Sequence, residues 1–546
     1  MYSPAPTVRL LRAESAEHPF AMTIAAAWTC YGARPARVEN VLKLLDDPVD
    51  PTDEVRSARR NRAVGLYDGL FEAGHHTTFQ HANFVFVLDG VSRLAIWSFF
   101  HHHPHYNSEQ VSQRYREVSG KVMISPRLTP RQQEIYAAAA ERGVEGYRRI
   151  SQLLAGDVAE RYASVFPARA RAQGVKAAER MAEAVQRKSQ EVARYVLPLA
   201  TPAHLYHTIN GLTLLRYYVL ANQMDVPHEV RYIVNRMMAE VQALDPRFLG
   251  EAGHLLDLQQ MDLSDTLEHQ VLLGLRGTID GQGDEAFFTE FDERLGERSS
   301  RLAGYSPDAE ALLADAVRAV LGVPRAALDD TAAIATVMDP AKNAYLGHPL
   351  FLAMNSKLMQ TLNHVPFTFQ KSISGAEDAQ NQRHRGTLSS SPILAAHLRQ
   401  HPDVIIPQDV TRSEAALEEY HATVAALWQA KNQLLDDGAD PEAALYLLPN
   451  SHRVRFYESG TLLTYYWKWV KRLCLNAQRE IFDSAWEETM QVAEQFPRIG
   501  DWVCAPPCVV RSRAGATPPC PEGERYCGVP IWRNYSPETL PLRRVF

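Results

Sequence analysis

The residues best suited to bind a charged ligand lie in two short segments, one in each half of the chain. The first begins at Ser112 and reads S-Q-R-Y, so a hydroxyl stands beside a guanidinium. The second begins at Arg383 and reads R-H-R, three residues after Gln380. A guanidinium is a permanent cation with a planar set of donors, which suits a phosphate or a carboxylate. By itself, however, S-x-R is equally typical of a solvated surface arginine.

Two other groups offer metal chemistry. His101, His102 and His103 are adjacent, with His105 close behind, but neighbouring residues point in different directions and make a poor chelate. We therefore expect no metal there, and a zinc hydrolase built on this run is the weakest alternative. Near the end of the chain, four thiols could hold a tetrahedral zinc, although their spacing matches no standard finger. They are Cys504, Cys508, Cys520 and Cys527. A reduced, proline-rich tail explains them equally well, and Cys30 and Cys474 are expected to be packed residues.

Composition narrows the class of protein. The chain has 546 residues, of which 46% are hydrophobic and 22% charged, as in ordinary globular proteins. Its net charge of −7 argues against general nucleic-acid binding. It contains no apolar run near the roughly 20 residues that span a bilayer, and its start has no signal-peptide pattern. Six cysteines are too few for a disulfide scaffold. We expect a soluble, cytoplasmic, reduced protein that binds neither membrane nor nucleic acid.

The elements that must position these residues occur twice. The segments from His81 and His364 share the pattern H-x-x-F-x-F, whose alternation predicts a half-buried strand. The later segment 191–198, EVARYVLP, is echoed by 442–449, EAALYLLP. We therefore predict an α+β chain of two tandem modules, helix-rich with a small mixed sheet. The expected boundaries are 1–285 for the first module and 296–546 for the second, which includes the cysteine-rich tail.

Long amphipathic stretches predict the helices. They are expected over 131–155, 169–195, 203–243, 307–321, 412–436 and 459–495. Strands are expected near 82–89 and 365–371 and at the start of each half.

Several spaced motifs of the first half resemble the flavin-dependent thymidylate synthase family. That family carries G-H-x-T-x-x-E-H-x-x-F-x-F, then R-H-R, then S-x-R-Y, then E-V-A-R-x-x-L-P. The matching positions are Gly74, His75, Thr77, His81, Phe84, Phe86, Ser112, Arg114, Tyr115, Glu191, Arg194 and Pro198. Glu109 and Asn210 are the nearest equivalents of a family glutamate and a flavin-contacting asparagine.

The second half resembles the same family through other motifs. Gln380 precedes Arg383-His384-Arg385, and the segment 472–481, RLCLNAQREI, is similar to the family's R-x-C-x-x-A-Q-x-E-I. Each half is incomplete in a complementary way. The first has His101-His102-His103 in place of R-H-R and Ala221 in place of an arginine that binds nucleotide. The second lacks S-x-R-Y and has Leu445 in place of the arginine in E-V-A-R.

These complementary losses favour a composite site shared by the two halves over two decaying copies. The resemblance implies nucleotide-binding roles for Glu109, Ser112, Arg114, Arg194, Gln380 and Arg472, with Arg472 also catalytic. It implies flavin-binding roles for His75, Asn210, Arg383, His384 and Arg385.

The activity that the resemblance implies is methylation of dUMP at C5 of the uracil ring. FAD would be the cofactor, and NADPH and methylenetetrahydrofolate the co-substrates. Family members are tetramers, so this double-length chain is expected to be a homodimer with a tetramer-like core. Two alternatives stay open: a paralogue that methylates another uracil nucleotide such as UMP, and a non-catalytic relative that binds flavin or nucleotide.

Overall fold

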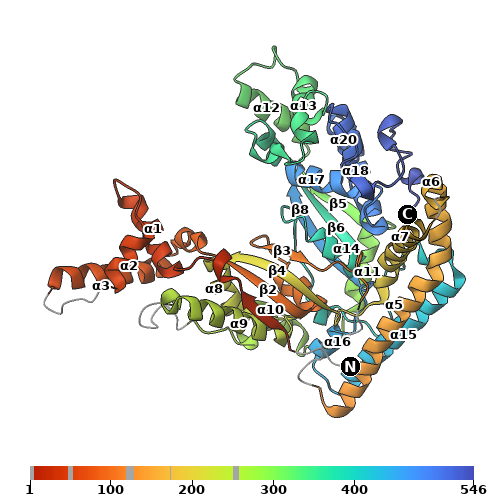
Figure 1. Cartoon of the computed structure of the whole chain (residues 1–546). Coiled ribbons are helices and arrows are strands. Elements are labelled where there is room, and N and C mark those ends of the chain that lie inside the picture. The colour runs from red at the N-terminus through yellow and green to blue at the C-terminus, as the bar shows by residue number, and fades with distance from the viewer. Residues whose placement is uncertain (1–4, 47–52, 119–127, 172–173, 250–257) are drawn as a thin grey trace.

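The computed structural model describes residues 5–46, 53–118, 128–171, 174–249 and 258–546. Its centre holds two four-stranded antiparallel sheets of the same design, each with its own helices (Figure 1). The first sheet has the order β1-β2-β4-β3 and is formed by Thr7–Leu10 (β1), Asn83–Ser92 (β2), Asn107–Gln110 (β3) and Pro202–Asn210 (β4). The second has the order β5-β6-β8-β7 and is formed by Ser300–Tyr305 (β5), Pro366–Ser374 (β6), Leu388–Ser389 (β7) and Arg453–Thr461 (β8). Equal strand order is what a tandem duplication of one module produces.

The helices of the first half include the longest helix described. They are Pro19–Tyr31 (α1), Val38–Asp46 (α2), Glu54–Glu72 (α3), Arg93–Ala95 (α4), Pro130–Val165 (α5), Pro167–Ala170 (α6), Val175–Ala193 (α7), Gly211–Leu220 (α8), His228–Leu244 (α9) and Leu267–Arg276 (α10). The next helix, Glu285–Leu295 (α11), contacts β6 of the second half. Thr129 begins α5 with a capping box, in which its side chain and that of Gln132 satisfy each other's backbone N–H groups.

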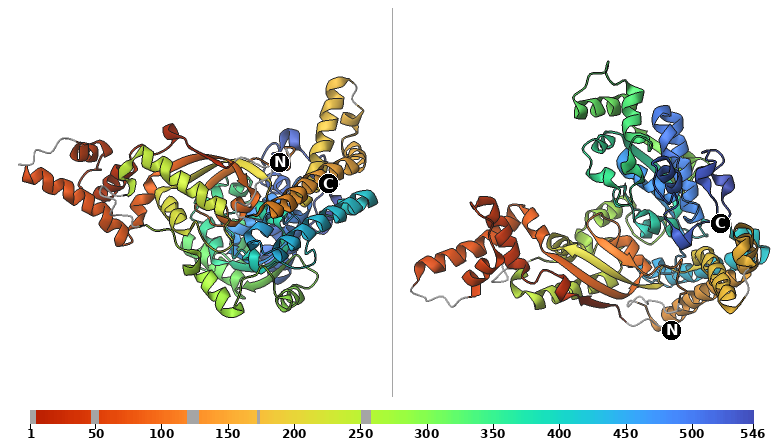
Figure 2. Two further views of the ribbon diagram at one scale, coloured as in Figure 1. Left: turned by 90° about the horizontal axis from the view of Figure 1, so that it is seen from below. Right: turned by 45° about the horizontal axis from the view of Figure 1, so that its top comes forward.

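The helices of the second half repeat this plan. They are Ala309–Leu321 (α12), Asp330–Met338 (α13), Gly375–Asn381 (α14), Glu414–Asp436 (α15), Pro441–Leu445 (α16), Leu462–Arg472 (α17), Arg479–Gln495 (α18), Pro497–Val503 (α19) and Pro507–Arg513 (α20). The arm α1–α3 extends away from the centre in one direction, and α12 and α13 extend in another (Figure 2). The long helices α5 and α15 lie side by side.

An approximate two-fold axis relates the halves and passes near Pro198 and Pro449, which pair with each other. The contacts around it are reciprocal. The amide of Leu199 donates to the carbonyl of Leu448 at 2.8 Å, and that of Asn450 donates to Leu197 at 2.8 Å. Residues of both halves also share one hydrophobic core along α5 and α15. The chain thus contains its own pseudo-dimer interface.

The strands and helices follow from burial patterns that the sequence shows only in part. The helix expected over 203–243 is wrong at its start, because Pro202–Asn210 is the central strand β4. Its residues alternate, with Leu205 and Ile209 buried and Tyr206 exposed, which is a period of two. The helix expected over 459–495 is wrong at its start, since 459–461 belong to β8, and it is interrupted by the loop 473–478. Both sheets are antiparallel, where a mixed sheet was expected.

Candidate functional site

A cavity of about 320 Å³ lies between the two halves. Its wall contains seven of the predicted site residues, four from the first half and three from the second. These are Glu109, Ser112, Arg114 and Arg194, together with Gln380, Arg383 and Arg472. Its volume lies in the range of small-molecule pockets. Residues that stand hundreds of positions apart in sequence therefore meet in one space.

Arg114 is held from both halves. It lies just beyond β3, and its guanidinium donates to Glu191 Oε2 at 2.7 Å and to the backbone carbonyl of Asn476 at 3.0 Å. Burial works against the charge of Glu191, but Lys188 and Arg114 together lower its pKa to about 2. The carboxylate therefore stays ionised and fixes the arginine. The hydroxyl of Ser112 accepts a bond from the Arg114 amide at 3.2 Å.

Arg472 ends α17, so the helix axis determines its position. Its Nε donates to His384 Nε2 at 2.8 Å, and its Nη2 donates to the carbonyl of Gln380 at 2.6 Å. Since an arginine can only donate, Nε2 of His384 carries no proton. Burial, and after it Arg472, lowers the pKa of His384 well below its usual value. Burial and the charge of Arg114 lower the pKa of Arg472 to about 10, so it is still a cation at neutral pH.

Arg194 follows α7 and is buried. Its Nη2 donates to Gln478 Oε1 of the other half at 2.9 Å. Within the described residues, neither Arg194 nor Arg472 forms a salt bridge with a carboxylate, whereas Arg114 and Arg383 do. A buried cation without a counter-charge is costly, and an anionic ligand relieves that cost.

Sequence reasoning missed Arg93, which also lines the cavity. It begins α4 and donates to Gln110 Oε1 at 2.9 Å and to the carbonyl of Val111 at 2.6 Å. Burial, followed by the charge of Arg194, lowers its pKa to about 10. No motif in the sequence distinguishes Arg93 from other arginines, because its burial depends on the folded position of α4, directly after β2.

Several polar atoms on the cavity wall are buried and have no hydrogen-bond partner among the described residues. They are Arg93 Nε, His101 Nε2, Gln113 Nε2, Arg194 Nε, Gln380 Oε1 and His452 Nε2. Buried polar atoms normally find partners, so a group of unpaired donors and acceptors in one cavity indicates a polar ligand.

The residues predicted to bind flavin fall into two places. Arg383 pairs with Glu109 at 2.7 Å, and Arg385 lies over the ring of Tyr106 at 5.4 Å, next to the cavity. His75 and Asn210 line none of the described cavities. His75 is exposed, and Asn210 caps α8 by accepting a bond from the amide of Thr213 at 2.9 Å.

The histidine run has separate partners. The ring of His101 stacks on Tyr106 with 4.6 Å between centroids, and His103 is 2.7 Å from the hydroxyl of Tyr217. Across the parts of the chain that the structure describes, no group of three or more His, Cys, Asp or Glu side chains stands in metal-ligand geometry.

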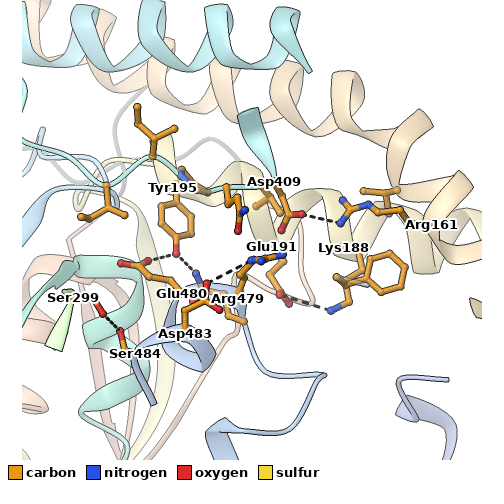
Figure 3. Close-up of a pocket in the computed structure, with 18 of the residues that line it drawn as sticks. Arg161, Lys188, Glu191, Tyr195, Ser299, Asp409, Arg479, Glu480, Asp483 and Ser484 are labelled. Atoms are coloured by element: carbon orange, nitrogen blue, oxygen red, sulfur yellow. Dashed lines mark hydrogen bonds and ion pairs between the residues drawn. The ribbon is translucent and has the colours of Figure 1, made fainter. Parts of the chain in front are cut away.

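A second cavity, of about 250 Å³, is lined by residues that hold arginines of the first (Figure 3). Glu191 binds Arg114, and Gln478 binds Arg194. The charged side chains of the second cavity come from both halves. Lys188 Nζ lies 3.8 Å from Glu191 Oε1, and Arg161 pairs with Asp409 at 2.8 Å. The carboxylate that binds Arg114, that of Glu191, therefore belongs to a residue that lines this second cavity.

The pseudo-two-fold axis relates the cavity between the halves to a second, equivalent region of the molecule, here called the second face. At the second face, the positions equivalent to Arg114, Arg194 and Arg472 hold other residues. From α7 and α16 onward, equivalent positions of the halves are offset by 251, as shown by the helix starts at His228 and Arg479, whereas the earlier strands have larger offsets. Arg472 and Arg194 correspond to Ala221 and Leu445. Ser108 and Ser389 pair with equivalent positions of β4 and β8, and counting six residues onward from each leads to Arg114 and Ala395.

The model of the family described as thymidylate synthase complementing protein matches residues 10–247 and 301–498. The chain belongs to this family. The two matched regions fit the tandem arrangement of the sheets, and they confirm the prediction of a flavin-dependent thymidylate synthase-like enzyme with two modules.

Individual relatives carry the same name. A flavin-dependent thymidylate synthase of Clostridium tetani is 25% identical over 40% of this chain and 81% of its own length. One from Geobacter sulfurreducens is 28% identical over 37% of this chain and 75% of its own length. Among solved structures, the UMP/dUMP methylase PolB from Streptomyces cacaoi bound with 5-Br dUMP is 17% identical. The matched region covers 45% of this chain and 95% of the PolB chain, with a TM-score of 0.30.

None of the helices in the described part of this family member has both the length and the apolar character needed to cross a membrane.

Proposed function

We propose that this protein methylates a uracil nucleotide at C5, converting dUMP to dTMP, in the cavity between its two halves. One observation carries the proposal: Arg114, Arg194 and Arg472 converge there from both halves, beside polar atoms that lack partners. Family membership supplies the reaction class, and the cavity supplies a place where an anionic, hydrogen-bonding substrate fits.

The nucleotide phosphate would lie against Arg114 and Arg194. Glu191 holds the first guanidinium, and the Nε of Arg194 is buried without a partner. Charge-assisted bonds to a phosphate are shorter and stronger than neutral ones, especially from a planar fork. The hydroxyl of Ser112 is a further donor. Its role is binding, since within the described residues its hydroxyl forms a hydrogen bond with the Arg114 amide and none with a base.

The pyrimidine edge would lie against Arg472 and Gln380. Two of the five N–H groups of Arg472 donate to His384 and Gln380, so the others are available to a ligand. A fixed cation in a water-poor site stabilises negative charge that develops on the ring during addition at C5. His384 orients this cation because its lone pair accepts the Nε–H.

The residues beside the cavity fit FAD in part. Arg383, His384 and Arg385 provide two exposed cations at its mouth, suited to a flavin and its phosphates. His75 and Asn210 would contribute from a second chain, in the proposed homodimer with a tetramer-like core. Bound FAD supplies the redox chemistry, with NADPH as reductant and methylenetetrahydrofolate as carbon donor. The protein orients these groups.

We also propose that the modules span 1–285 and 296–546. The regions matched by the family model lie inside these bounds.

The test compares Arg114→Ala and Arg472→Ala, which lie in different halves, with Arg412→Ala as matched control. Arg412 forms an exposed pair with Asp157, and neither residue lines the cavity. Both site variants should lose dUMP binding in calorimetry, while the control binds normally. An effect of only one of them contradicts a shared site.

Parallel assays with dUMP and UMP, on protein whose flavin spectrum is recorded, decide between the two nucleotides. A colourless protein that takes up neither FAD nor nucleotide contradicts the activity.

A further inference from the structure

Four of the six cysteines line one small cavity of about 20 Å³ in the second half. They are Cys474, Cys508, Cys520 and Cys527. Such a volume holds one water-sized occupant. The rest of the wall is mainly proline and aliphatic side chains, including Pro506, Pro507, Pro521, Val529 and Ile531. The cavity is therefore too small for an organic ligand and is the right size for a single ion.

The quartet differs by one member from the one suggested by sequence spacing. Cys504 is buried elsewhere, and its thiol donates to the carbonyls of Thr489 at 3.8 Å and Gly500 at 3.9 Å. Its place is taken by Cys474, from the loop that follows α17. Cys474 was expected to be merely packed, and Cys30, expected likewise, is exposed.

We propose that Cys474, Cys508, Cys520 and Cys527 form a zinc site that fixes the loop after α17. Four thiolates around one cavity are a preferred ligand set for structural zinc. The sulfur atoms do not yet stand in ligand geometry in the structure, so binding requires the thiols to turn inward. All four cysteines already line one atom-sized cavity.

Zinc would displace the thiol protons of its four ligands, because the thiolate is the form that binds the metal. Binding of Zn²⁺ forms four Zn–S bonds and releases four S–H protons to solvent.

The loop that this site would fix, 473–478, contacts arginines that line the cavity between the halves. Cys474 stands two residues after Arg472. The carbonyl of Asn476 accepts from Arg114, and the side chain of Gln478 accepts from Arg194. A rigid loop therefore positions all three arginines. This consequence rests on the proposed function, whereas the metal content does not.

The experiment measures zinc in the full chain, purified under reducing conditions and incubated with zinc alone, by elemental analysis after gel filtration. About one zinc per chain is expected. Cys474→Ser and Cys520→Ser should each reduce it severalfold, and Cys504→Ser, the matched buried control, should leave it unchanged. Cobalt(II) added to the unmodified chain should give intense thiolate-to-metal charge-transfer absorption, with proton release in a weakly buffered solution.

Absence of zinc and of the cobalt bands in the unmodified chain overturns the site, as does a loss of zinc in Cys504→Ser equal to that in Cys474→Ser. The cobalt measurement uses no variant, so misfolding of a variant cannot decide the result. Zinc bound at full stoichiometry without nucleotide binding supports the metal site while contradicting the proposed function.

Discussion

The two faces of the pseudo-dimer show what happens when duplicated sites are free to diverge. One face has arginines at positions 114, 194 and 472, and the related positions on the other face are Ala395, Leu445 and Ala221. At the second face, Leu394 is 2% exposed and belongs to the core shared by both halves. All three cations are lost together. This is expected physically, because a buried arginine without an anion to bind is costly.

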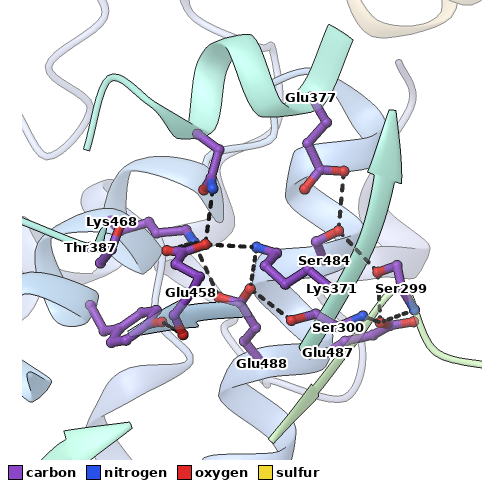
Figure 4. Close-up of polar contacts among 12 residues, drawn as sticks. Ser299, Ser300, Lys371, Glu377, Thr387, Glu458, Lys468, Ser484, Glu487 and Glu488 are labelled. Carbon is purple, nitrogen blue, oxygen red and sulfur yellow. Dashed lines mark hydrogen bonds and ion pairs between the residues drawn. The ribbon is translucent and has the colours of Figure 1, made fainter. Parts of the chain in front are cut away.

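The buried centres of the two halves also contain different residue types at equivalent positions. In the second half, Lys371 and Lys468 are buried with Glu458 and Glu488 (Figure 4). Lys371 Nζ lies 2.6 Å from Glu488, and Lys468 Nζ lies 2.7 Å from Glu458. The first half has Leu88, His207, Tyr217 and Met237 at the corresponding places, where His207 and Tyr217 are joined at 3.1 Å. One fold thus accommodates an ionic centre or an uncharged one.

The largest expected effect comes from breaking the ionic centre. Lys371→Met leaves two buried carboxylates with one cation, so the free energy of unfolding should fall by about 3–5 kcal/mol. Denaturant unfolding measures it. Leu88→Met at the matched position of the first half is the control and should cost less than about 1.5 kcal/mol. Equal costs would mean that substitution in the ionic centre is no more destabilising than substitution in the uncharged one.

The next effect sharpens the comparison of the two faces. Arg194→Leu copies the residue at the related position, Leu445, and should weaken dUMP binding by about 2–4 kcal/mol because a charged bond is lost. Calorimetric titration measures the change. Leu445→Met, a matched substitution at the other face, should leave binding unchanged, and weaker binding in that variant would contradict the assignment of the faces.

Glu191 holds the guanidinium of Arg114 in place, and its substitution should give a smaller, pH-dependent effect. Its folded pKa, about 2, is below that of an unfolded glutamate, so its stabilisation is present above pH 4.5 and is lost as the pH falls toward 2. Glu191→Gln should flatten this part of the stability profile and raise KM for the nucleotide severalfold. Acid unfolding followed by circular dichroism tests the first outcome, and a profile identical to that of the parent protein would oppose it.

The smallest effect concerns Glu229, at the pseudo-two-fold interface. Burial raises its pKa to about 7, although bonds from Ser92 and Tyr446 oppose the shift. A raised carboxyl pKa means that stability decreases as the pH rises from about 4.5 to 7 and is constant above. Glu229→Gln should remove this decrease, as measured by thermal unfolding across that range. A decrease that persists in the variant would have to come from another group.

The sequence predicted the duplication and most long helices, because H-x-x-F-x-F and the amphipathic periods are local signals. It missed β4, since a leucine- and tyrosine-rich run hides the period of two over Pro202–Asn210. The cavity residues were predictable where a motif carried them, as for Arg114 and Arg472. Arg93 and the thiol of Cys474 were not, because their neighbours come from chain segments that no spacing connects.

The reciprocal backbone hydrogen bonds beside Pro198 and Pro449 join the two modules of one polypeptide. Their association is intramolecular, so dilution does not separate them. In an assembly of identical subunits, every substitution appears at all equivalent positions at once. Here a single codon alters one position only, which is how an asymmetric pair of faces becomes heritable.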